Sequence, residues 1–161
     1  MPEDFHSSAA PTPNGNYSHV LKAGGLLHVC GWMGDVPETG EIIEGGVEAQ
    51  TVCTFSNLSH NIFTKEMGND LFLVANEPQR PPEANRDQAM KNISSSLKAA
   101  GSDPSKIVRR RIYTLDMAYL PTIQEVTKRY LSEPWPVSTA VQVSGLAKKG
   151  ALVEIEVIAE A

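Results

Sequence analysis

The chain ends in a segment whose apolar and acidic residues alternate. In VEIEVIAE, residues 153–160, apolar side chains occupy alternate positions, and Glu154 and Glu156 fall between them. Side chains on a β-strand point alternately to the two faces of a sheet. The pattern therefore predicts a strand that buries one face, and a second layer of structure must cover that face.

Two helices are predicted to supply that layer. Residues 83–100 carry an apolar stripe at three- and four-residue steps, which predicts an amphipathic helix. A second helix is predicted over 120–132, a β-hairpin over 20–34, and strands over 107–115, 137–145 and 151–159. This order of elements predicts an α+β fold, in which both helices pack on one face of a mixed sheet.

Length and charge restrict the classes of protein to consider. The 161 residues fit one domain; we expect it over 17–161, after a flexible lead-in over 1–16 that is rich in Pro, Ser and Ala. The net charge of −5 counts against a nucleic-acid or anionic-membrane partner. The polar N-terminus lacks the apolar core of a signal peptide, and the two cysteines demand no disulfide, so we expect a cytoplasmic protein.

Reactive side chains are scattered, and no spacing of histidines and cysteines indicates a metal site. Glu154 and Glu156 share a strand face, which is either a solvated surface or a cleft that holds a catalytic carboxylate. His28, Cys30 and Trp32 share a face by the same period of two, and this face either packs in the core or lines a pocket.

Three consecutive arginines, Arg109, Arg110 and Arg111, lie on a predicted strand. Strand alternation points the middle side chain away from its two neighbours. Surface or intersubunit ion pairs explain these arginines, with nucleic-acid binding as the alternative reading.

Several motifs, in order, resemble one family. NYSHVLKAGG, PETGEI, EANRDQAMKNISSSLKAAG, VRRRIYTLDMAYLPTIQEVTKRYL and KKGALVEIEVIAEA are similar to segments of the RidA/YjgF family (reactive intermediate deaminase A, also known as endoribonuclease L-PSP or translation-inhibitor-like). The resemblance implies a chorismate-mutase-like fold and a homotrimer with clefts between subunits. It also implies hydrolysis of enamines and imines to ketones and ammonia, without metal or cofactor.

The resemblance carries three site residues over to this chain. Tyr17 corresponds to a tyrosine of the family's cleft, and we expect it to donate or orient a proton. Gly31 corresponds to the glycine whose backbone approaches the ligand. Glu154 corresponds to the glutamate linked to the catalytic water, which makes it our candidate base.

Other positions depart from the family. Ser138 replaces the arginine that clamps the substrate carboxylate, and Ala140 replaces a cysteine. Cys30 and Trp32 flank the glycine in place of serine and glutamine, and His28 is a further candidate for the pocket wall. Because a serine cannot replace the charge of a guanidinium, we expect a bulky or uncharged substrate.

An additional segment at about 46–82 is predicted to be an insertion, either a lid on the cleft or a surface excursion. Our leading hypothesis is a diverged RidA-like enzyme acting on a small molecule. Its reaction would be imine or enamine hydrolysis, or a related hydration, dehydration, tautomerisation or cyclisation, in specialised biosynthesis. The alternatives are a non-catalytic trimer that binds small molecules and an endoribonuclease or translation inhibitor.

Overall fold

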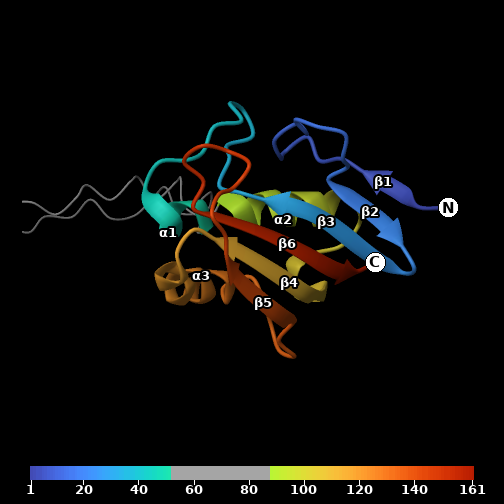
Figure 1. Cartoon of the computed structure of the whole chain (residues 1–161). Helices are drawn as coiled ribbons and strands as arrows, with labels where there is room; N and C mark the ends of the chain where they lie inside the picture. Colours follow the sequence, from blue (N-terminus) through green and yellow to red (C-terminus); the bar gives the residue numbers. More distant parts are fainter. Residues whose placement is uncertain (52–87) are drawn as a thin grey trace, which may run out of the picture.

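A single mixed sheet holds all the strands of residues 1–51 and 88–161, which are the residues that the computed structural model describes (Figure 1). Its strand order is β1-β2-β3-β6-β4-β5. β4 and β5 pair in parallel, and every other neighbouring pair is antiparallel. The strands are β1 (Glu3–Phe5), β2 (Val20–Ala23), β3 (Leu26–Trp32), β4 (Ile107–Thr114), β5 (Val137–Gln142) and β6 (Val153–Glu160).

The helices lie on one side of this sheet, so the predicted α+β architecture is confirmed. They are α1 (Gly46–Thr51), α2 (Gln88–Ala99) and α3 (Leu120–Thr127). α2 packs on β3 and β6, and α1 packs against α2 and α3. The core between the layers includes Leu27, Met90, Ile93, Leu97, Ile112, Ile123 and Ile155. No helix in the described part of the chain is long and apolar enough to cross a membrane.

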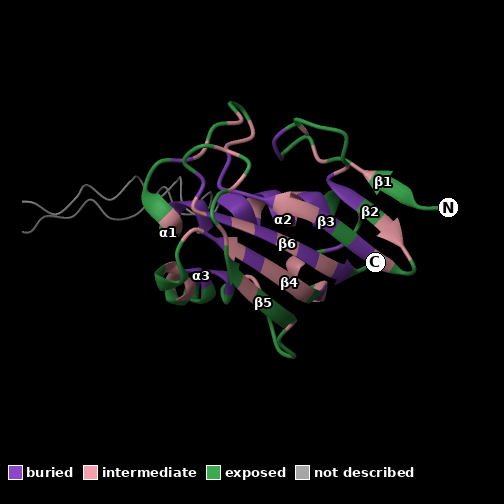
Figure 2. Cartoon of the chain, in the orientation of Figure 1, coloured by how far each residue is buried: buried purple, intermediate pink, exposed green. Residues whose placement is uncertain are grey.

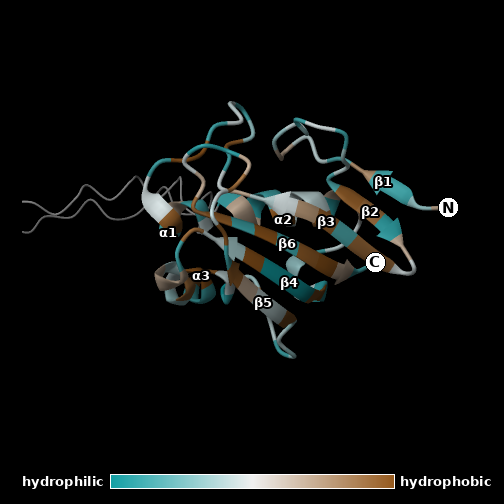
Figure 3. Ribbon diagram, in the orientation of Figure 1, coloured by the Kyte–Doolittle hydropathy of each residue, from teal (hydrophilic) through white to brown (hydrophobic). Residues whose placement is uncertain are grey.

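The closing strand β6 lies in the middle of the sheet, between β3 and β4. Its burial alternates as the sequence predicts: Val153, Ile155 and Val157 are buried, and Glu154 and Glu156 are half-buried (Figure 2). The glutamates therefore point to the face of the sheet that the helices leave uncovered. On the neighbouring strand β4 the middle is hydrophilic (Figure 3).

A β-bulge in β3 corrects one prediction from the sequence. Val29 pairs with Val157 and Trp32 pairs with Ile155, so two residues of β3 lie opposite one residue of β6. The additional residue reverses the alternation. Trp32, only 3% exposed, therefore joins Val29 in the core, while His28 is exposed on the opposite face. His28, Cys30 and Trp32 do not line one common surface.

The N-terminal segment also differs from the expected flexible lead-in. Glu3–Phe5 pairs with β2 as an edge strand, and Ala10 is buried. The ring of His19 holds the loop between β1 and β2 by two hydrogen bonds. Its Nδ1 accepts a hydrogen bond from the Ser7 amide at 3.0 Å, and its Nε2 lies 2.9 Å from the Pro11 carbonyl oxygen. These bonds depend on residues distant in sequence, so composition alone did not indicate them.

Element boundaries differ slightly from the predicted ones. The second helix ends at Thr127 and its successor strand at Gln142, both earlier than the pattern indicated. The first predicted helix appears as α2 from Gln88, and its initial residues 83–87 lie outside the described chain. The first residues of the predicted insertion, 46–51, form α1. Its remaining residues, 52–82, lie outside the residues that the structure describes.

Because the bulge puts Trp32 in the core and His28 on the exposed face, we expect truncation of these two side chains to change the free energy of unfolding by very different amounts. Trp32→Ala should lower the free energy of unfolding by about 3–5 kcal/mol because it empties a core position. His28→Ala should change it by no more than about 0.5 kcal/mol because that side chain is exposed. Urea unfolding of both variants measures this, and similar losses would contradict the assigned faces.

Candidate functional site

The carboxylate of Glu154 lies directly over the backbone of Gly31, at the bulge of β3. A methyl group built at Gly31 would meet Oε1 of Glu154 at 2.0 Å, far inside van der Waals contact. Only glycine therefore allows this close approach. The fold thus brings together two of the candidate site residues from strands distant in sequence.

Glu154 is a half-buried carboxylate with no hydrogen-bond or ion-pair partner among the described residues. Burial raises its pKa above the ordinary value, and the negative charges of Glu156 and Asp35 raise it further. Loss of solvation and nearby like charge both disfavour the ionised form. Such a carboxylate both holds and releases a proton closer to neutral pH than an exposed one does.

Glu156, the next glutamate on the same face, is fully engaged. Arg111 Nη1 donates to its Oε1 at 2.7 Å, and the Tyr113 hydroxyl donates to its Oε2 at 3.2 Å. Both partners come from β4, which pairs with β6 in the matching register. One glutamate is therefore fixed in an ion pair, and its neighbour Glu154 is left available for chemistry.

Cys30 lies beside this site but does not suit a nucleophile. The residue is half-buried and packs against the core. Burial, with the negative charges of Asp35 and Glu154, raises the pKa of its thiol to about 12. Because the thiolate is the reactive form, the Cys30 thiol stays protonated at neutral pH and forms part of the wall.

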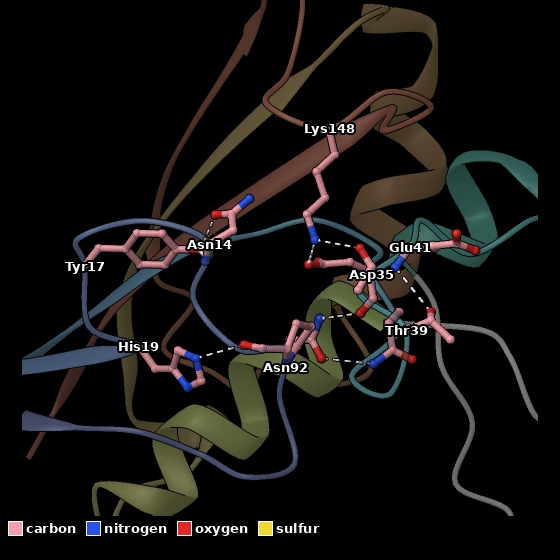
Figure 4. Close-up of polar contacts among 11 residues, drawn as sticks. Asn14, Tyr17, His19, Asp35, Thr39, Glu41, Asn92 and Lys148 are labelled. Atoms are coloured by element: carbon pink, nitrogen blue, oxygen red, sulfur yellow. Dashed lines mark hydrogen bonds and ion pairs between the residues drawn. The ribbon is translucent and has the colours of Figure 1, made fainter.

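An ion pair joins the two loops next to the carboxylate (Figure 4). Lys148 Nζ, from the loop before β6, lies 2.5 Å from Asp35 Oδ2 and 2.8 Å from the Gly40 carbonyl oxygen, both in the loop after β3. Asn92 of α2 donates to the Asp35 carbonyl oxygen at 2.9 Å. An open depression of about 760 Å³ beside this pair is lined by Gly40–Gly46, Gln50, Lys148–Gly150 and Leu152.

Arg110 reaches Ser138 on the helix-covered side of the sheet. The two residues pair across β4 and β5, and Arg110 Nε donates to Ser138 Oγ at 3.0 Å. Its Nη1 also donates to the Thr127 hydroxyl of α3. No carboxylate lies within ion-pair distance of this guanidinium among the described residues, and burial lowers the pKa of Arg110.

Among the described residues, none of the remaining candidate site residues is hydrogen-bonded to Glu154. Ala140 packs against the core from β5, on the same face as Ser138. The Tyr17 hydroxyl donates to Asn14 Oδ1 at 3.0 Å, and His28 points to solvent. The described residues contain no group of three His, Cys, Asp or Glu side chains that could hold a metal ion.

Sequence reasoning missed Asp35, Lys148 and the contact of Arg110. Asp35 and Lys148 are separated by most of the chain, and no short motif links them. Strand alternation predicted that Arg110 points away from Arg109 and Arg111. It could not predict the partner of Arg110 on β5, because the register of a parallel pair depends on the crossover between the strands.

Comparisons with known proteins give consistent similarities. The family model named Endoribonuclease L-PSP matches residues 7–75 and 74–161. A RutC family protein of Pyrococcus horikoshii is 30% identical over 99% of this chain and 98% of its own length. Mouse 2-iminobutanoate/2-iminopropanoate deaminase is 27% identical over 95% of this chain and 87% of its own. The crystal structure of RidA from an Antarctic Psychrobacter species matches with a TM-score of 0.73, at 28% identity, over 99% of both chains.

The raised pKa of Glu154 has a consequence for stability. The folded state binds this proton more tightly than the unfolded state, so the contribution of Glu154 to stability falls as pH rises from the unfolded pKa through the folded one. We therefore expect Glu154→Gln to raise the urea midpoint at pH 7 and to lose this gain below pH 4. Equal midpoints for the variant and the parent at pH 7 would contradict the raised pKa.

Proposed function

Since the chain belongs to the endoribonuclease L-PSP (RidA/YjgF) family, we propose that it hydrolyses imines or enamines of small molecules to ketones and ammonia. The observation that carries this proposal is the Glu154 carboxylate, half-buried and unpartnered over the backbone of Gly31. The names of the mouse and Arabidopsis relatives, an iminobutanoate deaminase and a reactive intermediate deaminase, support the same reaction class.

In the proposed first step, Glu154 removes a proton from a water molecule as the water oxygen attacks the carbon of a protonated imine. A C–O bond forms, and the electron pair of the C=N bond moves to nitrogen, which gives a carbinolamine. The proton now resides on Glu154. A base whose pKa lies closer to neutral pH is suited to this role, because it is ionised before the step and still accepts a proton during it.

In the second step, the Glu154 carboxyl returns its proton to the amine nitrogen. The C–N bond breaks and its electron pair leaves with ammonia, while an oxygen lone pair forms the C=O bond. The oxonium proton passes to ammonia, which leaves as ammonium. Enamines enter the same sequence after protonation at carbon. Tyr17, 45% exposed, is proposed as the proton donor for that entry, supplied across an interface by a second copy.

The expectation of an uncharged substrate rested on the arginine that is missing at position 138. Arg110 brings a guanidinium to the same place from the neighbouring strand, and no carboxylate among the described residues pairs with it. A partly buried cation of this kind favours an anionic ligand. We therefore revise the proposal: the substrate carries a carboxylate, which Arg110 and Ser138 hold.

Arg110 and Glu154 point to opposite faces of one chain's sheet, so one active site would combine them from two copies. β5 is one of the two edge strands of the sheet and presents Ser138 at the margin of the chain. This arrangement supports the proposed homotrimer with clefts between subunits. A cytoplasmic location and a role in biosynthesis remain parts of the same proposal.

The family's name favours ribonuclease activity as a second candidate. The arginine triplet offers little support, because its members do not form one basic surface: Arg111 is ion-paired with Glu156, and Arg110 lies on the other face. RNA cleavage that copurifies with the protein and disappears when Arg109–Arg111 are replaced would favour this candidate. A trimer that only binds small molecules is the third, and it requires no carboxylate base.

We expect Glu154→Gln to lower the rate of ammonia release from 2-iminobutanoate by about a hundredfold or more, because an amide cannot accept the proton of water. Glu160→Gln, on the exposed end of the same strand, is the matched control and should keep the parent rate. Turnover by the Glu154 variant at the parent rate would exclude the proposed base. Retained binding without turnover in the parent protein would favour the non-catalytic trimer.

We expect Arg110→Gln to weaken the binding of 2-oxobutanoate about tenfold to a hundredfold, because a charge-assisted pair with the carboxylate is lost. The binding of the neutral 2-oxobutanamide should change little, and Arg109→Gln serves as the charge-matched control. Adding Ser138→Arg to Arg110→Gln should restore 2-oxobutanoate binding. Calorimetric titration measures all four proteins, and equal losses for both ligands would contradict a carboxylate clamp.

A further inference from the structure

An ion pair between a buried aspartate and a half-buried lysine holds together the two loops next to Glu154. Asp35 follows the bulge of β3, just beyond Gly31, and Lys148 precedes β6, which carries Glu154. Lys148 Nζ lies 2.5 Å from Asp35 Oδ2 and also contacts the Gly40 carbonyl oxygen at 2.8 Å (Figure 4). The pair therefore connects the loop that follows β3, which carries Gly31, to the loop that precedes β6, which carries Glu154.

Asp35 depends on Lys148 for the balance of its charge. Asp35 is 4% exposed, and its Oδ1 is buried with no hydrogen-bond partner in the described part of the chain. The only ion pair that its side chain makes there is with Lys148. The backbone at Asp35 is separately fixed by Asn92 and by the bridge to Ile42. The backbone of Asp35 is thus held in place whether or not its side-chain charge is compensated.

The other titratable groups around Glu154 have partners of their own or keep their protons. On β6, Glu156 forms an ion pair with Arg111 and accepts a further hydrogen bond from Tyr113, both from β4. On β3, Cys30 keeps its proton because burial raises the pKa of the thiol to about 12. The negative charges of Glu156 and, to a smaller extent, of Asp35 raise the pKa of Glu154. Of the two ion pairs, Asp35–Lys148 is the more buried, so solvent screens its charges less.

We propose that Asp35 and Lys148 act as a positioning pair for the catalytic carboxylate: they fix the two loops that flank Glu154 and set the net charge that it faces. This inference rests on the proposed function of Glu154. The two members have opposite effects. Asp35 disfavours the ionised form of Glu154 by repulsion, and Lys148 limits that repulsion by cancelling the charge of Asp35.

Opposite effects distinguish this role from simple support of the fold. Asp35→Asn removes the repulsion, so the pKa of Glu154 should fall. Lys148→Met leaves the Asp35 carboxylate uncompensated, so the pKa of Glu154 should rise. A pair with only a structural role would lower stability in both variants without moving the Glu154 pKa in opposite directions.

The experiment measures the acid limb of the pH–rate profile for ammonia release from 2-iminobutanoate. It also titrates the Glu154 side-chain carboxyl by carbon NMR, with Glu154→Gln to assign the signal. Asp35→Asn should move both midpoints to lower pH and Lys148→Met should move both to higher pH, while the exposed neighbour variant Lys149→Met should move neither. Shifts in the same direction, or no shift, would overturn the proposal.

Two additions keep the test decisive. If either single variant fails to fold, the double variant Asp35→Asn/Lys148→Met leaves no unpaired charge. Its Glu154 midpoint should lie below that of the parent, because Asp35 raises that pKa directly, and an unchanged midpoint would overturn the proposal. The NMR titration needs no turnover. If the proposed function is wrong, Glu154→Gln will keep full activity. The NMR shifts would still show whether Asp35 and Lys148 set the pKa of Glu154.

Discussion

The close approach of the Glu154 carboxylate to the Gly31 backbone is the constraint on which the rest of the site depends. It requires a strand that buries alternate residues, so that Glu154 faces away from the core. It also requires a β-bulge in the neighbouring strand, which brings a glycine opposite and turns Trp32 inward. Without the glycine the carboxylate would be displaced, and without the bulge the tryptophan would lie on the face that Glu154 occupies.

Two glutamates on one strand face acquire different roles from their partners alone. Glu156 meets an arginine and a tyrosine that β4 presents in register, and it forms a fixed ion pair. Glu154, one pleat away, meets a glycine and no cation among the described residues. Desolvation without a compensating partner is a cost to stability, and the same condition raises the pKa of Glu154.

Much of this fold could be predicted from the sequence, because its elements have clear periods. The alternation in residues 153–160 predicted the central strand, and the apolar stripe predicted most of α2. The prediction failed where one residue changed the register: the bulge at Cys30–Gly31 reversed the face of Trp32. It also missed the order of residues 1–16, because that order comes from the contacts of His19 with Ser7 and Pro11.

The site was predictable only in part, for a physical reason. The positions of Gly31 and Glu154 followed from the family resemblance, and the fold brings them together. The other charged contacts come from pairings between distant segments: Asp35 with Lys148 beside the carboxylate, and Arg110 with Ser138 on the opposite face of the sheet. Such pairings leave no local pattern in a single sequence. The sequence shows the arginine that is missing at 138, and only the register of β4 and β5 shows that another guanidinium lies beside that position.

The most direct test of this account compares two quantities in the unaltered protein. One is the pKa of the Glu154 carboxyl, read by carbon NMR titration. The other is the midpoint of the acid limb of kcat/KM for ammonia release from 2-iminobutanoate. The account predicts that the two coincide at a value above that of an ordinary glutamate, because the ionised carboxylate is the base that activates water. An acid limb that falls at a different pH from the Glu154 titration would contradict it.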